Sequence, residues 1–397
     1  MIFLSLFFIF LLLWLVFDFT YGRKLYIQKL KPLSFPLRHS NFQLYTSGQT
    51  LYDNLFFDIA HAKEHIHILF FIVKNDEVSH TFLNLLMKKA KEGIEVRLLL
   101  DRLGSHYVSK ETITQLREHG IAFSFSHKIR PPFLFFTANQ RNHRKITIID
   151  GEIGYLGGFN IGEEYLGHNP NLGPWRDYHL RITGEGVLDL QNQFLHDWQG
   201  DTKEKLIQEA RFFKSLQKGT TPHQFVPTNG AYLEETFLHL IQKAEKKLYI
   251  GTPYFIPGKK VLHALQTARK RGVQITILVP KKADHPFVRE AKLPYCRNLI
   301  AAGCNIYEFQ NGFFHAKLIM IDDQICDIGT ANFDMRSLYI NHEINCIIYD
   351  SFFLEQVKAA IQQDIEASIL LSLQDVSPKT PLNKMKEWIG TVFSYFL

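Results

Sequence analysis

The hydrophobic pattern begins with an uninterrupted apolar run at the start of the chain. From Ile2 to Phe17 the sequence carries no charge and a single hydroxyl group. With residues 18–22 counted as interface, the run approaches the roughly 20 residues that cross a bilayer as a helix. A buried core helix explains the run less well, because a helix that is apolar on all sides is seldom the first element of a chain.

The residues on either side of this run predict whether it is cleaved and how it is oriented in the membrane. No basic segment precedes it and no small-residue cleavage site follows it, which favours an uncleaved anchor over residues 1–22 rather than a cleaved secretory signal. Positively charged segments stay on the cytoplasmic side, so we expect one span in the cell inner or plasma membrane with the rest of the chain in the cytoplasm. The basic residues that follow the span are Arg23, Lys24, Lys29, Lys31 and Arg38.

Beyond the anchor, apolar segments of strand length alternate with amphipathic segments of helix length, and the same order occurs twice. Strands that alternate with helices of this length predict βαβ units. We therefore expect an α/β fold of two pseudo-symmetric halves, each with a largely parallel or mixed sheet flanked by helices. The first copy comprises residues 51–64 (helix), 66–73 (strand), 82–92 (helix), 95–101 (strand) and 116–126 (helix end and strand); the second comprises residues 233–246, 247–256, 262–271, 273–280 and 299–309 in the same order.

The connection between the two copies is predicted from composition. Residues 203–227 are rich in charge and then in Gly, Thr and Pro, a mixture typical of a linker. We expect an N-terminal domain over residues 38–215 and a C-terminal domain over residues 216–397.

Composition excludes several classes of protein and leaves the partner open. The 397 residues are 46% hydrophobic and 21% charged, with four cysteines, which excludes a disordered chain and a disulfide scaffold. The net charge of +6 permits an anionic partner, lipid or nucleic acid, without choosing between them. The cysteines form no C-x-x-C pair, and we interpret them as free thiols of a reducing compartment; they are Cys296, Cys304, Cys326 and Cys346.

One short motif, H-x-K-x-x-x-x-D, occurs once in each copy at the corresponding point. A single match would be weak evidence, but a pair in register with a repeat is unlikely to arise by chance. On a strand, His and Lys two positions apart face the same side, whereas the Asp falls on the other side beside a turn. Its role is therefore open between catalysis and fixing the turn. The motif residues are His143, Lys145 and Asp150 in the first copy and His315, Lys317 and Asp322 in the second.

Polar residues downstream of each motif also correspond. Asn160 and Asn332 follow a small-residue turn in each half, as neutral donors to a bound anion or as caps of the next helix. Asp177 and Glu343 open matched strands. We expect each carboxylate to accept a hydrogen bond from the histidine of its own half, fixing the tautomer of that ring; ordinary strand-end charges are the alternative.

These residues resemble the phospholipase D superfamily, whose signature is the duplicated motif followed by a Gly-rich turn and Asn. The segments RNHRK, GGFNIGEEYLG, WRDYH, TPYFIP and HAKLIMIDDQICDIGTANFDMRSLYINHE are similar to those of bacterial cardiolipin synthases. The resemblance implies that one histidine forms a covalent phosphohistidine while the other protonates the leaving alcohol and deprotonates the incoming one. We assign His143 as the nucleophile and His315 as the general acid and base, although the pseudo-symmetry also permits the reverse.

In this interpretation, Lys145 and Lys317 hold the phosphoryl oxygens, assisted by Asn160 and Asn332. Because two lysines neutralise the charge and the sequence has no compact carboxylate cluster, no metal and no other cofactor is expected.

Two apolar segments are candidates for contact with lipid. Residues 127–142 carry Pro and Phe between basic residues, which suits insertion into a membrane interface or an ordinary loop folded onto its own core. The C-terminal segment, residues 381–397, has the composition of a helix lying on a bilayer or of a last packed helix.

The leading hypothesis is an anchored phosphatidyltransferase that converts two phosphatidylglycerol molecules into cardiolipin and glycerol. A phospholipase D hydrolase differs only in using water as the acceptor. A membrane-tethered nuclease would need a dense basic groove, which the near-balanced charge does not favour, so no nucleic-acid partner is expected. A non-catalytic lipid-binding protein is disfavoured because both His–Lys pairs are intact. The expected partners are a phospholipid and the membrane; the oligomeric state stays open.

Overall fold

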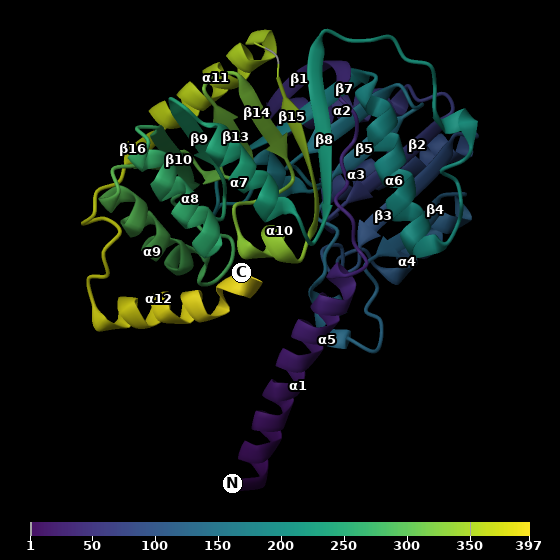
Figure 1. Cartoon of the computed structure of the whole chain (residues 1–397). Helices are drawn as coiled ribbons and strands as arrows, with labels where there is room; N and C mark the ends of the chain where they lie inside the picture. The colour runs from purple at the N-terminus through teal and green to yellow at the C-terminus, as the bar shows by residue number, and fades with distance from the viewer. Residues whose placement is uncertain (1, 350) are drawn as a thin grey trace.

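The computed structural model describes residues 2–349 and 351–397, and its most conspicuous element is a long first helix. Helix α1 (Ile2–Ile27) projects from the body of the molecule (Figure 1). It is the one described helix that is long and apolar enough to cross a membrane. Side chains such as Phe10, Leu13 and Phe17 are exposed along it. The helix extends five residues beyond the predicted limit of the anchor at residue 22.

The strands of the described residues form one sixteen-stranded sheet, in which the two copies predicted from the sequence lie side by side (Figure 1). The strand order is β16-β11-β10-β9-β13-β14-β15-β8-β1-β7-β6-β5-β2-β3-β4, with β12 paired to β7. The first half contains β1 (Arg38–Ser47), α2 (Gly48–Ala60), β2 (His65–Phe70), α3 (Glu77–Lys91), β3 (Glu95–Asp101), α4 (Lys110–Glu118), β4 (Ala122–Ser126), α5 (Leu134–Asn139), β5 (Ile146–Ile149), β6 (Ile153–Gly157), β7 (Trp175–Gly184) and α6 (Gly186–Thr202).

The second half repeats this order with a longer C-terminal end. It contains β8 (Thr221–Asn229), α7 (Leu233–Lys243), β9 (Lys247–Gly251), α8 (Gly258–Lys270), β10 (Gln274–Pro280), α9 (Val288–Ala301), β11 (Asn305–Phe309), β12 (Phe313–Phe314), β13 (Leu318–Ile321), β14 (Ile325–Gly329), α10 (Met335–Tyr339), β15 (His342–Ile348), α11 (Ser351–Glu366), β16 (Ser368–Leu370), α12 (Pro381–Phe393) and the 3₁₀ turn η3 (Ser394–Phe396).

The α/β class and the duplication are confirmed, and the sheet is mixed. Among neighbours in the main strand order, parallel pairing is confined to β2-β3-β4 and to β9-β10-β11. These are the strands linked by helices, as a parallel connection requires. The strands from β5 to β7 and from β13 to β15 pair antiparallel, because short turns or excursions join them.

The two halves meet where β1 pairs antiparallel with β8. Residues 221–227, predicted as part of a connector, are in fact most of β8, a central strand. Their alternating burial, with Thr221, His223 and Phe225 facing the core, is a strand pattern that the linker-like composition concealed. The division into domains at residues 215 and 216 stays a prediction.

The core is continuous across the two halves on one face of the sheet. A single apolar cluster joins α6 and α11 to strands of both copies, including Leu180 of β7, Phe225 of β8 and Ile344 of β15. Separate clusters lie under α2 and α3 in the first half and under α7 and α8 in the second. The two copies are therefore fused into one body by a shared apolar layer.

The base of α1 is fixed in the body by an aromatic cluster that we call the collar. Phe19 and Phe136 are buried in it, and Phe135 and Tyr395 pack against them. The Asp18 carboxylate accepts the backbone N–H of Phe136 at 2.8 Å. The predicted apolar loop at residues 127–142 thus folds as α5 against the anchor, rather than onto the core of its own half.

Candidate active site

Both His–Lys pairs lie at the start of a short strand at the same edge of the sheet. His143 and Lys145 precede β5, and His315 and Lys317 precede β13. Since β5 runs antiparallel to β2, and β13 to β9, these starts lie at the carboxyl ends of the parallel strands, where ligands of α/β sheets bind. All four side chains are buried.

The carboxylates that hold the histidines come from the opposite halves, which corrects the expected pairing. The Nδ1 atom of His143 lies 2.9 Å from Glu343 Oε2. The Nδ1 atom of His315 lies 2.5 Å from Asp177 Oδ2. The expectation that Asp177 orients His143 and that Glu343 orients His315 is therefore wrong. In both cases the Nε2 atom is the ring nitrogen left for chemistry.

The crossing has a cause in the backbone. Strand β12 pairs in parallel with β7 of the other half, aligning Phe314 with Arg176, and the N–H of His315 donates to the Arg176 carbonyl at 2.7 Å. The N–H of His143 donates to the carbonyl of His342 at 2.9 Å. Each histidine thus lies beside the residue that precedes the other half's carboxylate, so each His–carboxylate pair needs both halves.

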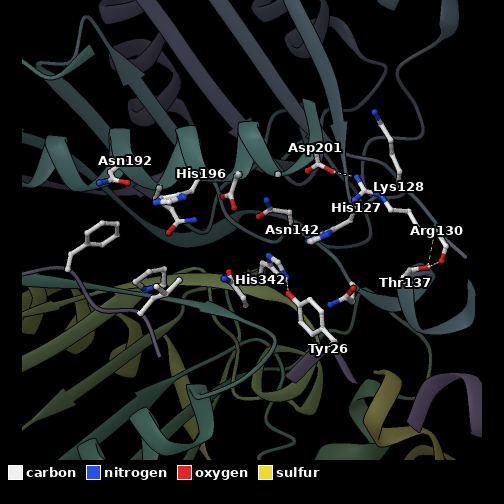
Figure 2. Close-up of a pocket in the computed structure, with 18 of the residues that line it drawn as sticks. Tyr26, His127, Lys128, Arg130, Thr137, Asn142, Asn192, His196, Asp201 and His342 are labelled. Atoms are coloured by element: carbon white, nitrogen blue, oxygen red, sulfur yellow. Dashed lines mark hydrogen bonds and ion pairs between the residues drawn. The ribbon is translucent and has the colours of Figure 1, made fainter. Parts of the chain in front are cut away.

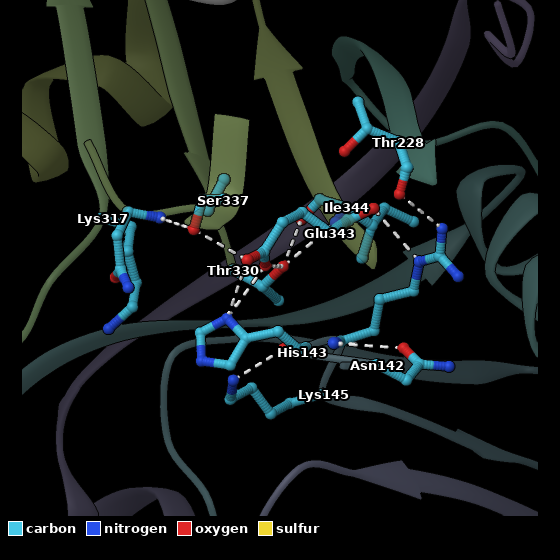
Figure 3. Close-up of polar contacts among 12 residues, drawn as sticks. Asn142, His143, Lys145, Thr228, Lys317, Thr330, Ser337, Glu343 and Ile344 are labelled. Carbon is cyan, nitrogen blue, oxygen red and sulfur yellow. Dashed lines mark hydrogen bonds and ion pairs between the residues drawn. The ribbon is translucent and has the colours of Figure 1, made fainter. Parts of the chain in front are cut away.

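The Glu343 carboxylate is held by hydroxyl groups as well as by His143 (Figure 3). The Thr330 hydroxyl donates to Oε2 at 2.6 Å, and the Ser337 hydroxyl lies 2.9 Å from Oε1. The Asp177 carboxylate instead accepts the N–H of Tyr178 at 2.8 Å. Ser337 was not predicted from the sequence. The corresponding residue of the first half, five positions after Asn160, is Tyr165, so the duplication gave no signal there.

Burial and nearby charges shift the pKa values of both lysines. Burial, opposed by the Glu343 carboxylate, lowers the pKa of Lys145 to about 7, and Lys317 lowers it as well. Burial also lowers the pKa of Lys317, against the pull of Asp177. Because each ammonium disfavours the charge of its neighbour, an anion placed between them would stabilise both charged forms.

Burial and neighbouring charges together set the protonation of the His–carboxylate pairs. Burial and then Lys317 lower the pKa of His315 to about 4, while Asp177 opposes them. Burial alone would raise the pKa of Asp177, but Lys317 and His315 hold it below its ordinary value. Burial also lowers the pKa of His143, against the pull of Glu343. Both rings are therefore neutral at pH 7 in the free protein and can offer a lone pair.

Aromatic side chains wall the site. Phe71 contacts the His143 ring edge-on with centroids 4.9 Å apart, and Lys145 lies over the same Phe71 ring. Trp175 packs on His315 with centroids 4.8 Å apart. Such walls exclude water and strengthen the charge interactions inside.

The two asparagines are near their motifs but are already engaged. Asn160 Oδ1 accepts the N–H of Ile72 at 3.0 Å, and its amide donates to Tyr165. The Asn332 amide donates to Asp334 at 3.0 Å, while its Oδ1 has no partner among the described atoms. The structure thus gives both residues a positioning contact; contact with substrate stays a prediction.

The motif aspartates do not join the site. Each lies at the far end of its strand and fixes a turn, because three successive backbone N–H groups donate to its carboxylate. For Asp150 these belong to residues 63–65, at 2.7–3.0 Å; for Asp322 they belong to residues 245–247, at 2.7–2.8 Å. Of the two roles left open by the sequence, the structural one fits this placement.

This placement predicts that Asp150→Ala lowers stability rather than the rate of chemistry. Three N–H groups would lose their acceptor, which costs about 2–5 kcal/mol of unfolding free energy. Thermal inactivation of the detergent-solubilised protein should shift down by several degrees, with kcat of the folded fraction within about threefold. Asp322→Ala, where the carboxylate is partly exposed, should give a smaller shift. A large loss of kcat at unchanged stability would contradict this prediction.

A separate cavity of about 490 Å³ has Asn142, the residue before the first motif, in its lining (Figure 2). Tyr26, His127, Lys128 and His196 are among the side chains that line it, together with Asn142 and His342, but neither His143 nor His315 is among its described lining residues. The fully buried Arg144 side chain binds Asp197, one of the lining residues, at 2.6 Å. The cavity is therefore distinct from the His–Lys site.

No group of three or more His, Cys, Asp or Glu side chains is placed to hold a metal ion within residues 2–349 and 351–397. The four cysteines are free and buried. Lys145 and Lys317 are buried cationic side chains beside the two histidines.

Comparison with known proteins agrees with this fold. The structure of phosphatidylserine synthase from Haemophilus influenzae Rd KW20 superposes with a TM-score of 0.72 at 17% identity, covering 95% of this chain and 100% of that one. The two proteins share a fold. The family model described as "Cardiolipin synthase, PLD-like domain" matches residues 55–198 and 237–365.

Two curated relatives extend the match over the whole chain. The minor cardiolipin synthase ClsB of Bacillus subtilis (strain 168) is 44% identical over 397 residues, which is 100% of this chain and 98% of that protein. Cardiolipin synthase 2 of Staphylococcus epidermidis is 38% identical over 364 residues, or 90% and 75% of the two chains. The chain belongs to the cardiolipin synthase family of phospholipase D-like proteins, and the resemblance stated from its motifs is confirmed.

Proposed function

We propose that this chain is a membrane-anchored phosphatidyltransferase of the cardiolipin synthase type, acting through a phosphohistidine. The observation that carries the proposal is the pair of crossed His–carboxylate contacts, His143–Glu343 and His315–Asp177, with a buried lysine beside each histidine. The similarity to two cardiolipin synthases along nearly the whole chain supports the same substrate, phosphatidylglycerol.

In the first step, His143 Nε2 attacks the phosphorus of phosphatidylglycerol. The bond from phosphorus to the headgroup oxygen breaks, and the leaving glycerol takes a proton from His315. The bound phosphodiester brings a negative charge that raises the pKa of His315 from its low value in the free protein, so the ring carries the proton that departs. Lys145 and Lys317 stabilise the charge on the equatorial oxygens.

In the second step, the free hydroxyl of another phosphatidylglycerol gives its proton to His315 and attacks the phosphorus. The P–N bond to His143 breaks, cardiolipin forms and both histidines return to their starting state. Glu343 and Asp177 keep the Nδ1–H tautomer and stabilise each imidazolium when it forms. We also place the catalytic body on the cytoplasmic side, supported by the basic residues that follow the apolar run.

The experiment that tests the transferase is a product analysis. Purified protein incubated with vesicles of labelled phosphatidylglycerol should release glycerol and form cardiolipin in a one-to-one ratio, because each transfer consumes a second lipid. The aromatic walls around the two histidines favour a lipid acceptor over water. Glycerol released together with phosphatidic acid, without cardiolipin, would identify a hydrolase and overturn the transferase.

A further inference from the structure

Helix α12 presents a row of apolar side chains outward, away from the domain. Leu382, Met385, Trp388, Val392 and Phe393 are all more than half exposed, with Trp388 at 67%. At 3.6 residues per turn they fall on one side of the helix. A contiguous exposed row of this kind marks an interaction surface rather than scattered surface residues.

The opposite side of α12 accounts for its contact with the domain. Gly390 packs against α9, where an added Cβ would lie 3.0 Å from the Ala291 nitrogen. Glu387 is buried and forms an ion pair with Arg297 at 2.6 Å. The helix thus contacts the domain through a polar and a small residue, and its apolar side faces outward. A helix that packs on a hydrophobic core has the opposite arrangement.

The position of α12 points to the bilayer as its partner. Figure 1 shows α12 at the end of the body from which α1 departs, running across the direction of α1. The turn that follows α12 joins the collar, where Phe396 lies 5.1 Å and Tyr395 5.6 Å from the Phe19 ring. The apolar surface of α12 is therefore continuous with the base of the span.

The exposed apolar part of α1 continues directly into the domain. Along α1 the side chains are apolar and exposed up to Phe17, at 57%, and the next two residues, Asp18 and Phe19, are buried in the collar. With no polar spacer between lipid-exposed turns and the domain, this end of the body must meet the leaflet. The apolar row of α12 lies at that same end.

The charges beside the row also fit a lipid surface. Lys384 and Lys386 are exposed and flank the apolar row on its two sides, where their stems can extend toward phosphate groups. Lys128, in the loop that leads to α5, is exposed as well. Anionic headgroups attract such residues.

We propose that α12 lies in the membrane interface, with its apolar row in the outer hydrocarbon, as a second attachment point beside α1. With two points the body can neither swing about the span nor lift from the surface. The carboxyl-end edge of the sheet that holds the His–Lys pairs is then kept at the leaflet from which lipid is drawn. This inference concerns attachment and does not depend on the reaction proposed above.

Tryptophan fluorescence tests the proposal on the full chain. The protein has four tryptophans; Trp14 lies in the span, Trp175 and Trp198 are buried, and Trp388 is exposed on α12. The Trp14→Phe variant is reconstituted into vesicles of phosphatidylglycerol and phosphatidylcholine whose acyl chains are brominated near the headgroup. We expect bromolipid to remove the Trp388 share of the emission and soluble acrylamide to leave it nearly unchanged.

The matched control is Trp14→Phe combined with Trp388→Phe, which retains the two buried tryptophans and should show no loss in bromolipid. Trp388 emission that acrylamide quenches and bromolipid does not would place α12 in water. Emission protected from both quenchers would place α12 against another protein surface, such as a second copy of the chain. Either result overturns the proposal.

Discussion

Substituting His143 by alanine is expected to abolish both transfer and formation of the covalent intermediate, with a fall in turnover of at least about 10³-fold. Replacing His315 by alanine should lower turnover to a similar degree but for another reason. His143 would still be present to attack phosphorus, while the leaving alcohol and the incoming alcohol would lack their proton donor and acceptor. The two variants should therefore differ in which step fails.

A lipid with an activated leaving group separates the two steps. Phosphatidyl-p-nitrophenol releases an anion that needs no proton, so attack by His143 can proceed without His315. With this substrate His315→Ala should give a burst of one nitrophenolate per protein and retain a labelled phosphatidyl group on the chain. His143→Ala should give neither signal. Because Glu343 holds the Nδ1 of His143, the label is expected on Nε2.

The same experiment decides between the two pseudo-symmetric assignments. A burst and retained label in His143→Ala, and not in His315→Ala, would make His315 the nucleophile. His119→Ala serves as a matched control, since His119 is the C-cap of α4 and its ring forms a hydrogen bond with the backbone carbonyl of Gln115 at 2.7 Å. Its turnover should be unchanged.

The sequence predicted the class of fold and the four central side chains because the evidence for them was duplicated. The order of helices and strands occurs twice, and the H-x-K motif occurs at the same point of each copy. Such a paired match is far less likely to arise by chance than a single one. Boundaries at the junction were less well predicted. Residues 221–227 have the composition of a linker but the alternating burial of a strand. The buried side chains pack against the first half, as His223 does against Phe42, so their burial depends on residues far away in the sequence.

The pairing of the histidines with their carboxylates could not be predicted from a repeat alone. A repeat shows that Asp177 corresponds to Glu343 and that His143 corresponds to His315, but any symmetric pairing, within or across the halves, satisfies that correspondence. The choice is made by long-range strand contacts, β12 with β7 and His143 with His342. Such contacts carry little local signal, since they depend on how the halves are placed.

The crossed pairing also predicts the effect of replacing each carboxylate by its amide. Glu343→Gln removes the negative charge that stabilises the His143 ring, and Asp177→Asn does the same for His315. Each should lower turnover by about 10²- to 10⁴-fold, the range expected when an orienting carboxylate becomes an amide. The hydroxyls of Thr330 and Ser337 can still bond to the glutamine amide, so the fold around residue 343 should persist.

The two variants should fail at different steps, because Glu343 contacts His143 and Asp177 contacts His315. With phosphatidyl-p-nitrophenol, Glu343→Gln should lose the burst, as His143→Ala does, although Glu343 belongs to the second half. Asp177→Asn should keep the burst and turn over slowly, as His315→Ala does. Pairing within each half would produce the opposite result. Asp364→Asn is a matched control for Asp177→Asn, because Asp364 is a buried carboxylate that binds Arg176, the residue before Asp177, at 2.6 Å. The Asp364→Asn variant should be less stable to heat, while the ratio of its burst to its turnover stays unchanged.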